Sequence, residues 1–153
     1  MQQCFHHAII ACTDSELLKS IGAALYVCEG TKARRDYRSA KGYIYSIELT
    51  NSNPNIIRLF SRFLKKIIKA DWKRMRGQLF IYPDLQDEIL KEFWANASGV
   101  PIQQFQKSII LKSKEGKFKA NPNGTFKIRY SSKEAFLQLE EIIVEFWKQM
   151  QIV

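Results

Sequence analysis

The chain has 153 residues, 46% of them hydrophobic and 25% charged, which suits one globular domain and excludes an intrinsically disordered chain. No apolar run approaches the length of a membrane-spanning helix, and we expect no secretory signal at the N-terminus. The net charge of +9 favours a polyanionic partner, and three cysteines without Cys-x-x-Cys spacing predict a reducing, cytoplasmic environment.

The first predicted element is a helix over residues 13–28. Thr13 and Glu16 have the spacing of a capping box, in which the hydroxyl and the carboxylate accept from backbone N–H groups at the helix start. Gly30 is expected to end the helix. Residues 1–12 are therefore predicted to be an N-terminal extension of a single-domain chain.

Small side chains line one face of this helix. Ser20, Ala24 and Cys28 repeat at every fourth residue, a spacing that places them above one another. Small residues let two helix backbones approach closely, and the chain offers no obvious second copy of the stripe. We therefore expect this helix to pack against the same helix of a second chain, about a two-fold axis.

Hydrophobic periodicity and turn residues predict the remaining elements. Helix starts are indicated by Asn53-Pro54, by Pro83-Asp84 and by a capping box at Ser131–Glu134, and Gly99 is expected to end the second of these helices. The predicted helices cover 54–69, 83–98 and 133–150, and the predicted strands cover 43–50, 72–82, 106–112 and 125–130.

Charge is segregated by element along the chain. Residues 31–82 have a balance of +10 and residues 104–129 a balance of +6, whereas the three other segments are acidic. The predicted strands are therefore basic and most predicted helices are acidic, which favours a sheet that binds nucleic acid on one face and is covered by helices on the other. The exception is the helix over 54–69, whose polar face carries Arg58, Arg62, Lys65, Lys66 and Lys69.

Basic residues on or beside the predicted strands are the candidate DNA contacts, because Lys and Arg neutralise phosphates. Solvation of an ordinary surface is the alternative explanation for such residues. The candidates are Lys32, Arg34, Arg35, Arg38, Lys41, Lys73, Arg74, Arg76, Lys107, Lys112, Lys127 and Arg129.

Glu29 stands at the end of the first predicted helix, next to Gly30. A carboxylate at a helix C-terminus opposes the negative end of the helix dipole, which is mildly unfavourable. A divalent cation would remove the conflict, because Mg²⁺ prefers one or two carboxylates together with water and phosphate oxygens. Glu29 is therefore either a metal ligand or an exposed acid beside a capping glycine.

The segment from Gly22 to Gly30, Gly-Ala-Ala-Leu-Tyr-Val-Cys-Glu-Gly, resembles the LAGLIDADG signature of homing endonucleases in the variant that ends Glu-Gly. Thr31-Lys32, and Ile47 to Pro54 before an apolar helix, resemble short single-motif members. The resemblance runs from about Thr13 to the C-terminus. It implies an α/β (α+β) fold of order αββαβ(α)ββα, with a curved antiparallel sheet that straddles DNA and carries helices on one face.

The same resemblance implies roles for individual residues. Glu29, with Gly30, would bind Mg²⁺ or Mn²⁺ at the scissile phosphates, and the motif helices would form a homodimer. Lys107, Lys32 and Gln78 are the candidates for the supporting lysine and the water-positioning residue, because they lie on or beside predicted strands of the basic face. The dimer positions implied are Ser20, Ala23, Ala24, Val27 and Cys28.

The function expected on this basis is a site-specific, Mg²⁺-dependent endonuclease that cuts double-stranded DNA as a homodimer. Two alternatives use the same basic sheet without cleavage of DNA. One is a DNA-binding protein such as a transcriptional regulator, and the other is an RNA-binding intron maturase. Only the metal centre separates the first function from the others.

Overall fold

The computed structural model describes residues 2–38, 42–112 and 121–151, with side chains from residue 14 onward, so Lys41 lies outside the described residues. A π-helical turn, η1 (Leu64–Ile68), extends α2, and two short 3₁₀ turns, η2 (Trp72–Arg74) and η3 (Ile102–Gln104), lie before β4 and after α3. The main elements are α1 (Gln2–Glu29), β1 (Arg34–Asp36), β2 (Gly42–Ile44), β3 (Ser46–Asn51), α2 (Pro54–Phe63), β4 (Arg76–Ile81), α3 (Asp87–Ser98), β5 (Ile109–Ile110), β6 (Thr125–Ser131) and α4 (Lys133–Gln149).

The chain is a mixed α/β structure built on a four-stranded sheet in the order β3-β6-β4-β5. β6 is antiparallel to both β3 and β4, whereas β5 is parallel to β4. The expectation of an all-antiparallel sheet is therefore wrong at the β5 edge. The reason is that α3 connects β4 to β5 as a crossover, which returns the chain in the same direction.

β1 and β2 form a β-hairpin, a separate two-stranded antiparallel sheet that precedes β3 in the chain. An isolated bridge pairs Gly30 with Leu49, and the Thr31 N–H donates to the Glu48 carbonyl at 2.9 Å. The segment that leaves α1 therefore runs along the free edge of β3 before it enters β1. The predicted single strand over 43–50 is broken at Tyr45, where β2 ends and β3 begins.

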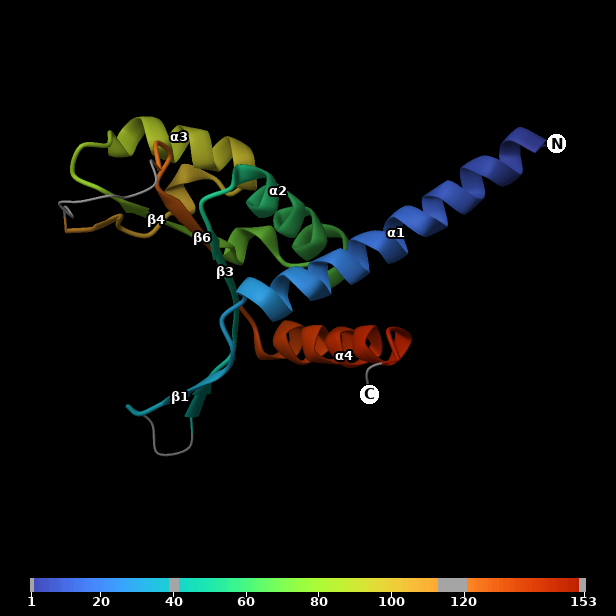
Figure 1. Cartoon of the computed structure of the whole chain (residues 1–153). Coiled ribbons are helices and arrows are strands. Elements are labelled where there is room, and N and C mark those ends of the chain that lie inside the picture. The colour runs from blue at the N-terminus through green and yellow to red at the C-terminus, as the bar shows by residue number, and fades with distance from the viewer. Residues whose placement is uncertain (1, 39–41, 113–120, 152–153) are drawn as a thin grey trace.

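The four α-helices of the described residues cover one face of the sheet (Figure 1). Along β6, Phe126, Ile128 and Tyr130 are buried, and they alternate with half-buried polar residues. The helices α1, α2 and α4 contact β3 on the buried face, and Trp94 of α3 stacks on Phe126 with ring centroids 5.2 Å apart. The hydrophobic core therefore lies between this face and the helices, and no helix of the described residues packs on the other face.

Most predicted helix ends are close to the observed ones. Asn53 caps α2 by accepting from the Asn55 N–H at 2.9 Å, and Gly99 ends α3 with φ of 72°. At α4 the cap is Ser132, one residue later than expected, and its Oγ accepts from the Ala135 N–H.

Three predicted starts are wrong. α1 begins at Gln2 instead of Thr13, because residues 2–12 contain neither glycine nor proline and the helix runs through them. α3 begins at Asp87, since Pro83 and the residues after it form a turn. β4 begins at Arg76, because the expected start of the strand forms the 3₁₀ turn η2. β5 is also shorter than expected, with two residues.

Candidate nucleic-acid interface

The uncovered face of the sheet carries polar and cationic side chains in register, and we call it the open face. Cross-strand partners point to the same side of a sheet, so the pairs of β6 with its two neighbours define rows. One row joins Glu48, Arg129 and Arg76, and the next joins Thr50, Lys127 and Gln78. These residues alternate with the apolar side chains that face the core. The open face is therefore basic at its centre, as the charge segregation predicts.

A charged cluster that the sequence did not single out lies on this face, around Glu48. Glu48 is 2% exposed, and it is the only buried acid among the described residues. Its Oε1 accepts from the Ser46 hydroxyl at 2.6 Å and lies 3.2 Å from Arg129 Nε and 3.7 Å from Arg34 Nη2. The Arg129 Nε–H is not aligned for a hydrogen bond, so this contact is an ion pair alone. Arg34 and Arg129, two of the predicted DNA contacts, are therefore partly neutralised by the buried carboxylate of Glu48.

Apart from the half-buried Lys127, the other predicted DNA contacts that the structure describes are exposed, but they do not all lie on the open face. Arg35 and Arg38 are on the β1–β2 hairpin, where Arg38 pairs with Asp36 at 3.3 Å. Arg74 lies at the end of the sheet, where its guanidinium is over the ring of Tyr130 and Nη2 donates to the Ser131 carbonyl at 2.5 Å. The remaining exposed candidates are Lys73 on η2, Lys107 before β5 and Lys112 after it.

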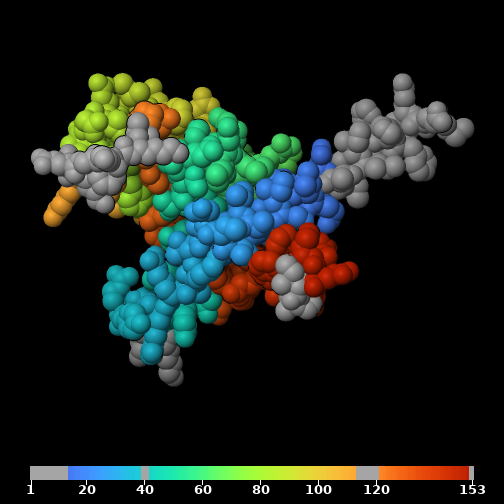
Figure 2. Space-filling view, in the orientation of Figure 1, coloured from blue at the N-terminus to red at the C-terminus, as the bar shows by residue number. Residues whose placement is uncertain are grey.

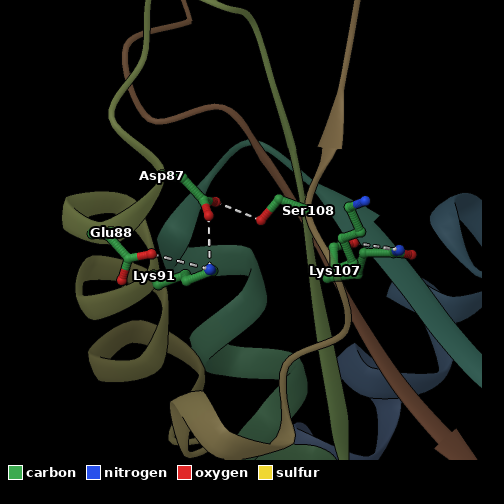
Figure 3. Close-up of polar contacts among 6 residues, drawn as sticks. Asp87, Glu88, Lys91, Lys107 and Ser108 are labelled. Atoms are coloured by element: carbon green, nitrogen blue, oxygen red, sulfur yellow. Dashed lines mark hydrogen bonds and ion pairs between the residues drawn. The ribbon is translucent and has the colours of Figure 1, made fainter.

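Gln78 and Lys107, two of the predicted catalytic residues, are brought together by a hydrogen bond, and Lys107 is labelled in Figure 3. The Gln78 amide donates from Nε2 to the Lys107 carbonyl at 3.0 Å, and the Gln106 N–H donates to the Gly77 carbonyl at 2.7 Å. The segment before β5 is therefore fixed against β4, with the exposed Lys107 side chain at the edge of the open face.

A second contact in Figure 3 ties this segment to α3. The Ser108 hydroxyl donates to Asp87 Oδ1 at 2.5 Å, and Lys91 Nζ lies 2.7 Å from Asp87 Oδ2 and 3.4 Å from Glu88. Burial acts to raise the pKa of Asp87, but the hydrogen bonds from Lys91 and Ser108 outweigh it and hold that pKa below its usual range. Asp87 therefore stays ionised and anchors Ser108.

Glu29 is not brought together with Gln78 or Lys107 within one chain. Gly30 pairs with β3 on the edge opposite β6, and β4 lies beyond β6. Neighbouring strands are about 4.8 Å apart, so Gly30 and β4 are separated by about 14 Å across the sheet. Glu29 itself is exposed and makes no ion pair among the described residues. The three predicted catalytic residues thus do not form one compact site in a single protomer.

Lys32 has a structural role at the end of α1. Its ammonium donates to the carbonyls of Tyr26 at 2.8 Å and Val27 at 3.2 Å, and it lies 4.7 Å from the centre of the Tyr26 ring. A cation there neutralises the free carbonyls of the last helical turn. The charge conflict that Glu29 creates at this helix end is therefore offset by Lys32, and no metal is required to remove it.

Tyr26 joins the same helix end to the sheet. It is 2% exposed, and its hydroxyl donates to the Thr31 carbonyl. Burial, and then the negative charges of Glu48 and Glu140, raise the pKa of Tyr26 to about 12. Gly30 must lack a side chain, because a Cβ there would overlap the Tyr26 ring. Gly30 therefore allows its backbone to pack closely against the Tyr26 ring.

The five predicted dimer residues lie on different sides of α1. Ala23 is 0% exposed inside its own chain, so it cannot contact a second copy, and that expectation is wrong. The rotation of the helix is set by Gly22, where a Cβ would overlap the ring of Phe63 in α2. Ala24 is half-buried and Cys28 is exposed on the outward side. They share that side with Leu17, which is 54% exposed.

An apolar groove adjoins this outward side. It lies between the last turn of α1 and the length of α4 from Phe136 to Trp147, has a volume of about 590 Å³, and is lined by Val27, Ile143 and Val144 among others. Ser20 lies nearer the N-terminus of α1, where it faces α4 in a narrower crevice. Figure 2 shows α1 uncovered between α2 and α4. The apolar surface available to a partner is thus wider than the stripe of small residues.

Comparisons of this chain with protein-family models, with curated proteins and with solved structures find no match. Across the residues described, no helix combines the length and apolar character needed to cross a membrane. The same residues contain no group of three or more His, Cys, Asp or Glu side chains placed to hold a metal ion. The functional proposal therefore rests on the geometry of the site itself.

The raised pKa of Tyr26 predicts a loss of stability at alkaline pH. Unfolded tyrosine titrates near pH 10, so the stabilisation is complete below about pH 10 and is lost as the pH rises towards 12. At pH 11 wild type should have lost about 1.4 kcal/mol of unfolding free energy through this group. Tyr26→Phe removes that loss, although below about pH 10 it costs about 1 kcal/mol relative to wild type through the missing hydrogen bond. Urea denaturation at pH 8 and pH 11 measures both effects.

The matched control is Tyr37→Phe, because Tyr37 is 90% exposed. This variant should keep the wild-type difference between pH 8 and pH 11. Equal differences for wild type and Tyr26→Phe would contradict the assignment.

Proposed function

We propose that this chain is a homodimeric DNA-binding protein of the LAGLIDADG homing-endonuclease type, which holds duplex DNA against the open face of its sheet and cuts it site-specifically with Mg²⁺ or Mn²⁺. The observation that carries the proposal is the open face itself, with Arg76, Lys127 and Gln78 in register and no helix of the described residues across them. Basic strand residues position a phosphate backbone, and neighbouring polar side chains contact base edges.

The order of elements supports a homing-endonuclease-like fold as part of this proposal. With β2 and β3 counted as one strand, the chain follows the order αββαβ(α)ββα that the resemblance implies. The parallel edge strand β5 departs from the implied antiparallel sheet. The helices nonetheless lie on one face and leave the other to a ligand, which is the feature that a DNA-straddling sheet requires.

A homodimer is supported by the outward side of α1. Ala24, Cys28 and Leu17 form an apolar strip there, and Val27 links it to the groove beside α4. A continuous exposed apolar patch can mark a protein interface. A two-fold axis through the strip would bring two copies of the α1 C-terminus together.

The catalytic part of the proposal concerns Glu29. The residue ends α1 beside the sheet edge, and its carboxylate is exposed. The described residues contain no group of three or more His, Cys, Asp or Glu side chains placed to hold a metal, so a Mg²⁺ site here would draw on Glu29 of both copies, with water and DNA phosphate oxygens as further ligands. A bound metal ion would supply Lewis-acid polarisation of the phosphate and an acidified water. The open face would hold the scissile phosphates next to this pair of carboxylates.

A DNA-binding protein that does not cut is the second candidate, and one observation favours it. Lys32 already offsets the charge at the end of α1, and Gln78 and Lys107 are fixed three strand spacings or more from Gly30. A transcriptional regulator of the same fold needs the basic sheet but no assembled catalytic site, so this arrangement is consistent with it. An RNA-binding maturase remains the third use of the same surface.

The substitution Glu29→Gln separates the first two candidates. We expect it to abolish cleavage while DNA affinity stays the same or rises slightly, because a negative charge near phosphates is lost. The measurement is nicking and linearisation of a plasmid library with Mg²⁺ and Mn²⁺, with Ca²⁺ as the non-supporting ion, beside a binding assay.

Glu92→Gln, on the exposed side of α3, is the matched control and should cut like wild type. Binding without cleavage of any sequence by wild type would favour the non-cutting candidate. Full cleavage by Glu29→Gln would place the catalytic centre elsewhere.

The homodimer has its own test in Ala24→Leu. A bulky side chain on the outward side of α1 should overpack the two-fold contact and cost about 1–3 kcal/mol of association free energy or more. Sedimentation equilibrium at micromolar concentration measures the shift towards monomer, and Asn96→Leu on the exposed side of α3 is the control. A wild type that is monomeric at these concentrations would refute the dimer.

A further inference from the structure

A second basic surface lies on α2 and η1, away from the open face. The segment 54–69 contains no acidic residue. None of its five cations makes an ion pair with a carboxylate among the described residues. All five are exposed. We call this surface the α2 ridge, and its members are Arg58, Arg62, Lys65, Lys66 and Lys69.

The ridge points away from the sheet. The opposite side of α2 is fully buried through Ile57 and Phe60, and the helix contacts β3 and β6 through the core. The cations therefore stand on the outer side of the helical layer, and a duplex on the open face cannot reach them. Figure 2 shows α2 uncovered on the surface between α3 and α1.

Two local features hold the ridge in place. Arg58 Nη1 donates to Asn55 Oδ1 at 2.9 Å, and Lys65 Nζ lies 4.8 Å from the centre of the Trp72 ring. These contacts use neutral partners, so they orient the two side chains and leave their charges uncompensated. Bound anions would therefore meet full positive charges.

Lys69, at the end of the ridge, has a backbone conformation that residues other than glycine rarely adopt. It caps η1 with φ of 56° and ψ of 43°, the left-handed conformation in which glycine is favoured. The turn before it is π-helical, a rare geometry that often marks functional sites. The cation thus stands at a backbone position that favours glycine, and this outlier motivates a functional hypothesis for Lys69.

The spacing of the cations identifies the kind of partner. From Arg58 to Lys69 the helix advances by about 16 Å, over which one DNA strand carries about five phosphates. Five cations therefore match one stretch of phosphate backbone. An anionic membrane is a poorer partner, because the apolar residues of α2 face the core and none of its described exposed side chains is apolar.

We propose that the α2 ridge is a second nucleic-acid site, which binds the phosphate backbone of a further duplex DNA segment without sequence preference. The identity of this partner as DNA rests on the proposed function, because a protein held on DNA by its open face meets other DNA segments at high local concentration. The ridge would let one molecule bridge two duplexes.

The test is capture of a second duplex. Protein is loaded on an immobilised short duplex, and a second fluorescent duplex of unrelated sequence is then offered at several salt concentrations. Wild type should capture it with steep salt dependence. Arg58→Gln/Lys66→Gln should lower the slope of log affinity against log salt by about 2 for this second duplex. Lys133→Gln/Lys148→Gln, which removes the same net charge from α4, should leave the slope unchanged.

Loss of second-duplex capture in the ridge variant alone supports the proposal. Equal capture by wild type and the ridge variant overturns it, as does ridge-dependent binding to phosphatidylserine vesicles or to an acidic protein in place of DNA. If the proposed function is wrong, a different variant shows it: Arg76→Gln/Lys127→Gln on the open face would leave binding of the first duplex unchanged. If the ridge variant then loses all binding, the ridge alone is the DNA site.

Lys69→Gly gives an independent check that does not depend on folding defects. Glycine relieves the left-handed backbone, so the midpoint of thermal unfolding should rise or stay the same. Capture of the second duplex should nevertheless weaken, with a slope about 1 smaller. Unchanged capture in this variant counts against a role for Lys69.

Discussion

The structure depends on the position of β6 between β3 and β4. β6 pairs along both edges, so its alternation of Phe126, Ile128 and Tyr130 with polar residues fixes which side of the sheet is covered. A shift of one residue in register would turn the apolar set towards water and the cations into the core. The same pairing that builds the core therefore also aligns Lys127 and Arg129 on the open face.

The second constraint is the close packing of α1. Gly22 lets the ring of Phe63 lie against the helix backbone, and Tyr26 is buried against the sheet side. This rotation presents Ala24 and Cys28 outward and brings the end of the helix to the free edge of β3. The proposed dimer contact and the proposed catalytic acid thus follow from one glycine–phenylalanine contact.

Much of the fold could be predicted because it is specified locally. Asn53-Pro54 and Gly99 mark helix ends through their own backbone preferences, and the strand over 125–130 follows from alternation alone. The start of α1 could not be predicted, because a capping-box sequence at Thr13 is equally compatible with the interior of a longer helix. The parallel pairing of β5 depends on a crossover, which is a tertiary property.

The site was predictable only as a basic surface. That Glu48 is buried between Arg34 and Arg129 depends on strand register, which sequence alternation alone does not give. The inward position of Ala23 was missed because a stripe of small residues does not reveal which side meets α2. Lys32 was expected to face a ligand, but it caps the end of α1 by donating to the carbonyl of Tyr26, six residues earlier, a contact that only the folded turn creates.

The central claim is that the open face binds duplex DNA, and the salt dependence of binding tests it most directly. If about six phosphates are neutralised, the slope of log affinity against log salt should be near −5 for wild type. Arg76→Gln/Lys127→Gln should reduce its magnitude by about 2, whereas the equally charged control Lys133→Gln/Lys148→Gln should not change it. A wild-type slope near zero, or a slope that the open-face substitutions leave unchanged, would contradict the account.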